Sequence, residues 1–109
     1  MDRLQLHPAD AARLLASADG ERPVLLDVRE PWELATARLP GSLDIPMGQI
    51  PERLDELPPD RPLIVMCHHG MRSLQVVMFL QHRGFESVSN LAGGIDAWSR
   101  EVDPSIPTY

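Results

Sequence analysis

The chain has 109 residues, of which 43% are hydrophobic and 24% are charged, a composition typical of one globular domain with its own core. Its net charge of −6 disfavours nucleic acid and anionic membranes as partners. The single cysteine excludes an internal disulfide, and no apolar run is long enough for a membrane span or a secretory signal. We therefore expect one domain over residues 1–109 and a cytoplasmic location.

In chain order, the sequence alternates helical and extended patterns, with prolines and glycines between them. The apolar runs that end near Asp27 and Cys67 are short and uninterrupted, as in strands buried on both faces of a parallel sheet. The predicted helices cover residues 9–18 (opened by Pro8 and ended by an Asp19-Gly20 turn), 30–34, 50–57, 73–83 and 95–100. The predicted strands cover residues 23–29, 43–46, 61–67 and 87–91, with an extended surface tail over 102–109. Trp32 and Trp98 are interpreted as packing residues.

Cys67 lies where a predicted strand ends and a short polar segment begins, with a helix directly after it. The segment reads Cys67-His68-His69-Gly70-Met71-Arg72-Ser73. Backbone N–H groups and the positive end of a helix dipole meet at such a junction, and both stabilise a thiolate or an anionic ligand. Cys67 is therefore the candidate nucleophile.

Alternating strands and helices indicate an α/β domain with a mostly parallel sheet, in which ligands bind at the carboxyl ends of the strands. Asp27, Arg29 and Cys67 all fall at predicted carboxyl ends, so we expect them at one edge of the sheet. Asp27 is interpreted as a support for nearby loop backbone. Arg29 is expected to pair with Glu30 or Glu33, so that it is a supporting residue too.

Four segments, taken together and in order, resemble the rhodanese-like sulfurtransferase family, as a stand-alone member. They are Leu25-Leu26-Asp27-Val28-Arg29-Glu30, Leu39-Pro40-Gly41-Ser42-Leu43-Asp44-Ile45-Pro46, the Cys67–Ser73 segment, and Leu91-Ala92-Gly93-Gly94-Ile95-Asp96-Ala97-Trp98. The resemblance spans roughly Gln5 to Trp98. It departs at Arg38, where many members have a histidine, and we interpret this as a surface change.

The resemblance implies a five-stranded parallel sheet with helices on both faces. It also implies transfer of a sulfane sulfur without a cofactor or a metal. In that chemistry, Cys67 takes the outer sulfur of a small anionic donor such as thiosulfate and holds it as a persulfide. The acceptor is cyanide, a thiol or a protein cysteine.

The residues that follow Cys67 are predicted to bind the substrate. Gly70 allows a tight loop whose N–H groups point inward, and Arg72 adds a permanent positive charge. Ser73 is also expected to cap the following helix. The predicted substrate-binding set is His68, His69, Gly70, Met71, Arg72 and Ser73.

The segment around Cys67 has three alternative interpretations. Cysteine-dependent phosphatases and arsenate reductases have a related loop, but their arginine comes one position later than Arg72, where this chain has Ser73. A metal at Cys67-His68-His69 is disfavoured because adjacent residues rarely converge on one ion and no second ligand pair follows. A regulatory module that carries persulfide to a protein partner shares the loop, and the sequence does not separate it from an enzyme.

Overall fold

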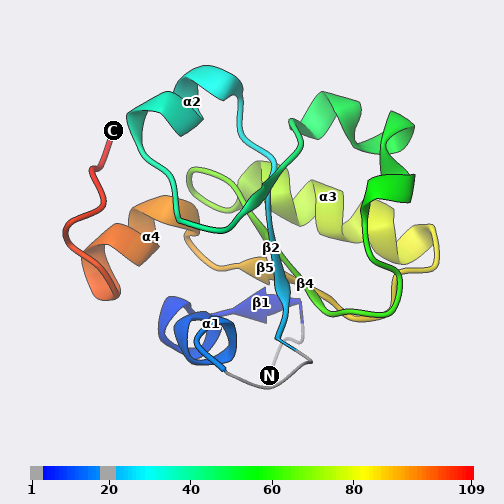
Figure 1. Ribbon diagram of the computed structural model, residues 1–109, viewed down its shortest axis with the longest axis horizontal. Helices are drawn as coiled ribbons and strands as arrows, with labels where there is room; N and C mark the ends of the chain where they lie inside the picture. The colour runs from blue at the N-terminus through cyan, green and yellow to red at the C-terminus, as the bar shows by residue number, and fades with distance from the viewer. Residues whose placement is uncertain (1–3, 18–21) are drawn as a thin grey trace.

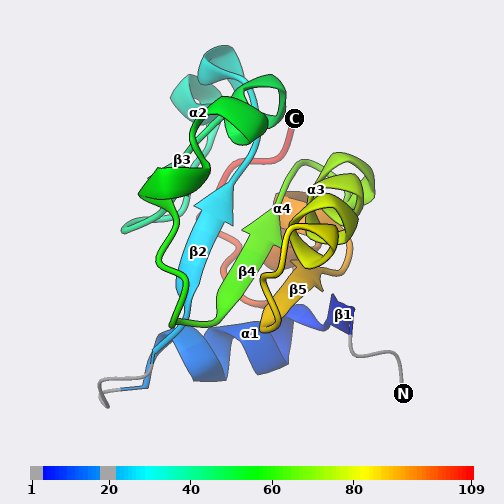
Figure 2. The same cartoon turned by 90° about the vertical axis from the view of Figure 1, so that its right-hand side faces the viewer.

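Five parallel strands form one sheet (Figure 1), and Figure 2 shows them in the order β1–β5–β4–β2–β3. The computed structural model describes residues 4–17 and 22–109. Its strands are β1 (Gln5–Leu6), β2 (Val24–Asp27), β3 (Leu43–Asp44), β4 (Leu63–Met66) and β5 (Val88–Leu91). The predicted α/β fold with a five-stranded parallel sheet is therefore confirmed.

Helices cover both faces of this sheet (Figures 1 and 2). One face packs against α1 (Pro8–Leu15) and α4 (Gly94–Glu101), and the other against α3 (Met71–His82) and the 3₁₀ helices η1 (Met47–Glu52) and η2 (Leu54–Glu56). The short helix α2 (Pro31–Thr36) lies beyond the carboxyl end of β2 (Figure 2). No helix within the described ranges is both long and apolar enough to cross a bilayer.

The apolar run of β4 is uninterrupted because its side chains alternate between two buried clusters. Leu63 and Val65 join the cluster that includes residues of α3 and η1. Ile64 and Met66 join the cluster that includes residues of α1 and α4. This double burial fixes the position of β4 in the middle of the sheet, and so fixes the point at which the next residue, Cys67, leaves it.

Several predicted boundaries differ from the structure. The predicted helix over 50–57 is two 3₁₀ helices, because Pro51 cannot donate an N–H group within a regular α-helix. The first helix ends at Leu15, and the predicted turn at Asp19-Gly20 lies outside the described residues. Strand β1 was not predicted, since its two residues are too short to show a pattern.

A buried ion pair lies at the carboxyl end of β2. Both side chains of Asp27 and Arg29 are fully buried, with Nη2 of Arg29 2.7 Å from Oδ2 of Asp27. The Asp27 carboxylate also accepts the backbone N–H of Arg29 at 3.1 Å, as expected of a support for loop backbone. The expected pairing of Arg29 with Glu30 or Glu33 was wrong, because the carboxylate two residues earlier meets the guanidinium on two atoms.

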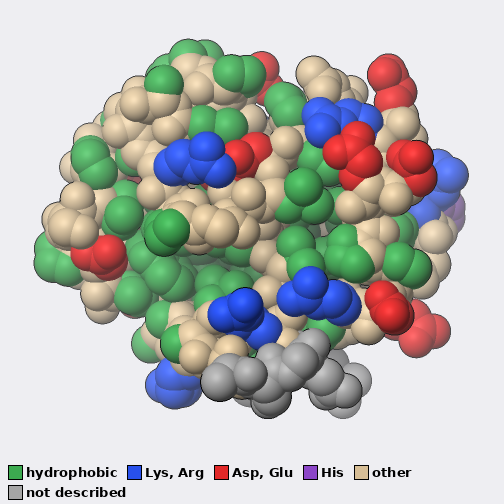
Figure 3. Space-filling model, viewed as in Figure 1, with side chains coloured by type: hydrophobic (Ala, Val, Ile, Leu, Met, Phe, Trp, Pro, Cys, Tyr) green, Lys and Arg blue, Asp and Glu red, His purple; other side chains and the backbone are tan. Residues whose placement is uncertain are grey.

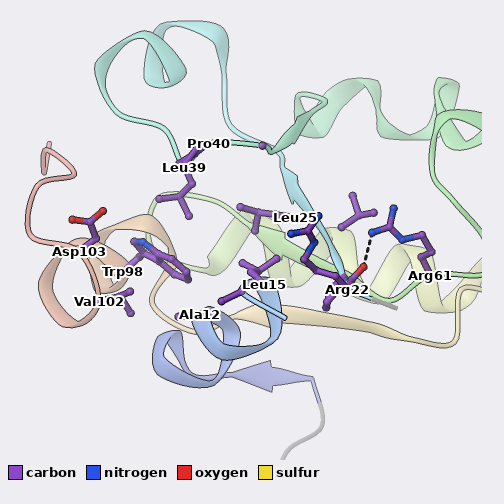
Figure 4. A pocket seen from close by; sticks show the side chains of 14 residues that line it. Ala12, Leu15, Arg22, Leu25, Leu39, Pro40, Arg61, Trp98, Val102 and Asp103 are labelled. Carbon is purple, nitrogen blue, oxygen red and sulfur yellow. Dashed lines mark hydrogen bonds between the residues drawn. The ribbon is translucent and has the colours of Figure 1, made fainter. Parts of the chain in front are cut away.

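An apolar groove lies on the face of the sheet that carries α1 and α4, with a cavity volume of about 720 Å³. Its walls include Leu15, Leu25, Leu39 and Trp98, with Arg22 and Arg61 at one end (Figure 4). Figure 3 shows hydrophobic side chains gathered in a hollow of this face with basic side chains along its edge. The groove reaches the start of β2, whereas Cys67 follows the end of the neighbouring β4, so the two features are separate.

Replacing Arg29 by methionine tests the buried ion pair. The Arg29→Met variant leaves the Asp27 carboxylate buried without its cation, so we expect a loss of about 3–5 kcal/mol in the free energy of unfolding. Urea denaturation of the variant and of wild type measures this loss in the free energy of unfolding. As a matched control, Arg53→Met breaks the more exposed pair with Glu56 and should cost far less stability, because solvent screens that pair. Equal losses in the two variants would contradict a structural role for the buried pair.

Candidate active site

The Cys67 sulfur lies in a ring of hydrogen-bond donors. The residue is 1% exposed and follows the last residue of β4. Its Sγ accepts the backbone N–H of Gly70 at 3.1 Å and the hydroxyl of Ser73 at 3.3 Å. The loop predicted from the sequence therefore wraps around the sulfur of Cys67.

The start of α4 determines which way the loop peptides face. The N–H groups of Ile95 and Asp96 donate to the carbonyls of Cys67 and His68 at 2.9 and 3.1 Å. No described peptide bond is cis, so each of these carbonyls points away from the N–H group of the same peptide. With the carbonyl of His68 held toward α4, the N–H group of His69 is turned to the other side, where it interacts with the sulfur of Cys67.

Gly94 makes this contact possible. A Cβ at Gly94 would lie 2.4 Å from the carbonyl oxygen of His68 and 2.5 Å from that of Cys67, closer than real Cβ contacts allow. Its φ of +65° is also a conformation that favours glycine. The tight turn before α4 is thus required by the approach of two backbones.

Helix α3 begins earlier than predicted. Gly70 has a φ of +100°, and this left-handed residue turns the chain so that the helix starts at Met71. Met71 and Arg72 therefore lie in the first helical turn, with Ser73, instead of in a loop. The prediction that Ser73 caps the helix was wrong, because it is the third helical residue and its hydroxyl faces the buried sulfur.

Asn90 holds the other side of this arrangement and was missed in the sequence. Its side chain is buried on β5, where Oδ1 accepts the hydroxyl of Ser73 and Nδ2 donates to the carbonyl of Gly70 at 3.1 Å. An asparagine within a predicted strand carries no local signal for such a role. The Ser73 hydroxyl has one proton and two acceptors, Asn90 Oδ1 and Cys67 Sγ, so it donates to one of them at a time.

These contacts favour the ionised form of the cysteine. Burial raises the pKa of the Cys67 thiol, but hydrogen bonds to the sulfur outweigh it. They come from the hydroxyl of Ser73 and from the backbone N–H groups of Ser73, Gly70 and His69, and the pKa is lowered overall. The thiolate is thus stabilised chiefly by neutral donors.

Arg72, predicted to bind substrate, is held by Glu33 in the structure. Its two terminal nitrogens donate to the two carboxylate oxygens of Glu33 at 2.7 and 2.9 Å. Glu33 is 3% exposed and also accepts the backbone N–H of Glu30 in a capping box at the start of α2. The pair joins α2 to the first turn of α3 beside the cysteine loop.

The expected surface tail over 102–109 ends in a packed side chain, so that expectation was wrong for Tyr109. Its hydroxyl donates to Glu33 at 2.7 Å and accepts from Nη1 of Arg29 at 2.9 Å, and its ring stacks on His68 at 3.8 Å between centroids. Burial raises the pKa of Tyr109 to about 12, with a smaller increase from the hydrogen bond to Glu33, while the hydrogen bond from Arg29 acts in the opposite direction. Trp32, expected to be a packing residue, is 64% exposed and makes a T-shaped contact with this ring.

The two histidines of the loop have different environments. His68 is half-buried between the rings of Tyr109 and His69, and its pKa is lowered, first by burial and then by the nearby His69. The side chain of His69 is 61% exposed and faces Asp96. Neither ring hydrogen-bonds to Cys67 in the contacts that the described residues make.

Comparison with known proteins agrees with this fold. The family described as the rhodanese-like domain matches residues 10–101. The chain belongs to the rhodanese-like family. A relative from Allochromatium vinosum named sulfurtransferase is 42% identical over 82% of this chain and 83% of its own length. The thiosulfate sulfurtransferase GlpE of Pseudoalteromonas translucida is 34% identical over 87% of this chain and 90% of its length.

Solved structures and longer relatives extend the comparison. A rhodanese-related protein from Thermoplasma volcanium superposes with a TM-score of 0.82 at 30% identity, over 96% of this chain and 98% of that one. A chloroplastic rhodanese-like/PpiC domain-containing protein of Arabidopsis thaliana is 48% identical over 78% of this chain, which spans only 30% of it. Rhodanese-like domains thus occur both as short chains and within longer ones.

Removing the Ser73 hydroxyl tests its effect on the thiolate. Ser73→Ala deletes one donor to Cys67, so the thiol should ionise at higher pH and react with iodoacetamide about tenfold more slowly at neutral pH, the worth of a hydrogen bond to a charged group. The pH profile of the alkylation rate measures both. Ser99→Ala removes a buried hydroxyl that bonds only within α4 and should leave the profile unchanged. Identical profiles for Ser73→Ala and wild type would exclude the proposed stabilisation.

Glu33 gives the protein an acid-sensitive contact. The hydrogen bonds from Arg72, and then from Tyr109 and Glu30, lower the pKa of Glu33 to about 2. Because this pKa lies below its unfolded value, the stabilisation is present above the unfolded pKa and is lost as pH falls toward 2. We expect wild type to lose about 3 kcal/mol more than Glu33→Gln between pH 5 and pH 2, measured by urea denaturation. The exposed Glu86→Gln control should follow wild type, and parallel curves for Glu33→Gln would contradict this role.

Proposed function

We propose that the protein is a sulfurtransferase that moves a sulfane sulfur through a persulfide on Cys67. The observation that carries this proposal is the buried Cys67 sulfur with hydrogen bonds from Gly70 and Ser73 and a lowered pKa. A thiolate is the nucleophilic form of cysteine, and this site favours it at the edge where parallel sheets bind ligands. The names of the short relatives support the same chemistry.

The proposed reaction has two balanced steps. The Cys67 thiolate attacks the outer sulfur of thiosulfate, a new S–S bond forms, and the S–S bond of the donor breaks with its electron pair leaving on sulfite. An acceptor such as cyanide or a thiolate then attacks the outer sulfur of the persulfide. That S–S bond breaks and its electron pair returns to Cys67, so no external oxidant or reductant is consumed.

The loop residues have proposed roles in both steps. Backbone N–H groups that face the sulfur, among them that of Gly70, stabilise the negative charge on the persulfide and on the departing sulfite. His68, His69 and Met71 line the path by which substrates reach the sulfur. The Ser73 hydroxyl donates its hydrogen bond to the sulfur when the sulfur is charged. Arg72 contributes a positive charge shared with Glu33, while Asp27 and Arg29 support the backbone beneath the loop.

The phosphatase alternative gains no support from the site. Arg72 follows Cys67 after four residues, and its terminal nitrogens are engaged by Glu33. Sulfur transfer needs donors around a single outer sulfur, which the hydrogen-bonded loop supplies. We propose that residues 1–109 work as one rhodanese-like domain in the cytoplasm, with a small sulfur-containing anion as donor and cyanide, a thiol or a protein cysteine as acceptor.

Intact-mass spectrometry tests the proposal directly. Incubation with thiosulfate should add the mass of one sulfur atom to the wild-type protein, because one nucleophilic cysteine takes one outer sulfur. Cyanide should remove the added mass and yield thiocyanate. Cys67→Ser, which keeps the size of the side chain but not its sulfur, should gain nothing. A wild-type protein that gains no sulfur from thiosulfate, mercaptopyruvate or glutathione persulfide would overturn the sulfurtransferase proposal.

A further inference from the structure

The two histidines of the cysteine loop form a cluster with a carboxylate, and in the reaction just described they exchange no proton or sulfur with the substrate. His68, His69 and Asp96 each present one ligand atom, and the three atoms all lie within 4.8 Å of one another. The sequence alone disfavours a metal at Cys67-His68-His69, because adjacent residues rarely converge on one ion and no second ligand pair follows. The fold adds Asp96, which is far away in sequence and belongs to α4.

Asp96 is held in place by its backbone. Its N–H group donates to the carbonyl of His68 at 3.1 Å, in the same contact that orients the loop peptides. Its Oδ2 lies 3.9 Å from Nδ1 of His69. The contact that shapes the cysteine loop therefore also brings a carboxylate to the two imidazoles.

Both imidazoles have capacity for a further interaction. Nε2 of His68 is buried and has no hydrogen-bond partner, so this ring has a polar atom whose requirement is unmet. The side chain of His69 is 61% exposed, so solvent reaches one side of its ring. An unsatisfied buried nitrogen beside an exposed imidazole and a carboxylate is an arrangement that a metal ion would complete.

We propose that His68, His69 and Asp96 form a binding site for a divalent transition-metal cation of the Zn²⁺ class. Two imidazole nitrogens and one carboxylate oxygen are a ligand set that Zn²⁺ accepts, with a fourth position left for water. Tetrahedral bonds of about 2.1 Å place ligand atoms about 3.4 Å apart. Closing from 4.8 Å to that spacing requires about an ångström of side-chain movement, which the exposed His69 allows.

Arg100 opposes this site and offers a way to test it. Its Nε lies 3.0 Å from Oδ2 of Asp96, so a cation must compete with the guanidinium for the carboxylate. Asp96 carries one charge and Arg100 is a largely exposed partner one helical turn away. Removing Arg100 is therefore expected to strengthen metal binding, an effect opposite to that of removing a ligand.

The experiment uses the full chain with Cys67→Ser, because a thiolate is itself a metal ligand and would obscure the result. In this background the outcome does not depend on sulfur transfer. Titration with Co²⁺ should give the intense visible absorption of a tetrahedral site at one equivalent. Zn²⁺ should displace it and should compete with a chromophoric chelator for a Kd in the micromolar range.

Four further substitutions in that background identify the ligands. His69→Ala and Asp96→Asn should each weaken Zn²⁺ binding at least tenfold, and Arg100→Gln should tighten it severalfold. His82→Ala removes an exposed imidazole at the end of α3 and should change nothing. His69 is exposed, so its substitution keeps the test valid even where Asp96→Asn disturbs the fold. Binding only at millimolar Zn²⁺, or binding that His69→Ala leaves intact, overturns the proposal.

Discussion

Two hydrogen bonds from the start of α4 to the carbonyls of Cys67 and His68 are the contact on which the site depends. A buried sulfur anion needs donors, and backbone peptides supply them only when their carbonyls are satisfied on the opposite side. Helix α4 accomplishes this with N–H groups that have no partner inside their own helix. The unmet donors at one helix end thus compensate the unmet acceptors of the loop, and Gly94 lets the two backbones approach closely enough.

A network of charged side chains lies next to this backbone arrangement. Asp27, Arg29, Tyr109, Glu33 and Arg72 form a chain of hydrogen bonds from the end of β2 to the first turn of α3. Each buried charge has an opposite partner, which is what permits so many ionic groups beside the core. This network of hydrogen bonds joins segments that are far apart in the sequence, so the surroundings of Cys67 depend on the folding of the whole domain.

The sequence was most informative where one local pattern decided the structure. The apolar runs of β2 and β4 and the polar segment after Cys67 placed the cysteine at the correct edge of the sheet. Features that arise from contacts between distant segments were not predictable in this way. In the sequence, Tyr109 belongs to an expected surface tail, and its stacking on His68 arises only from the fold. The early start of α3 follows from the left-handed conformation of Gly70.

The single proton of the Ser73 hydroxyl has a consequence for the sheet as a whole. When Cys67 carries a negative charge, the hydroxyl turns toward the sulfur, and Oδ1 of Asn90 on β5 loses a donor. The Asn90 amide also binds the side chain of Gln5 on the neighbouring β1. The side chains of Ser73, Asn90 and Gln5 therefore form one hydrogen-bonded row from the cysteine across β5 to β1, and the charge on the sulfur decides which acceptor takes the Ser73 proton.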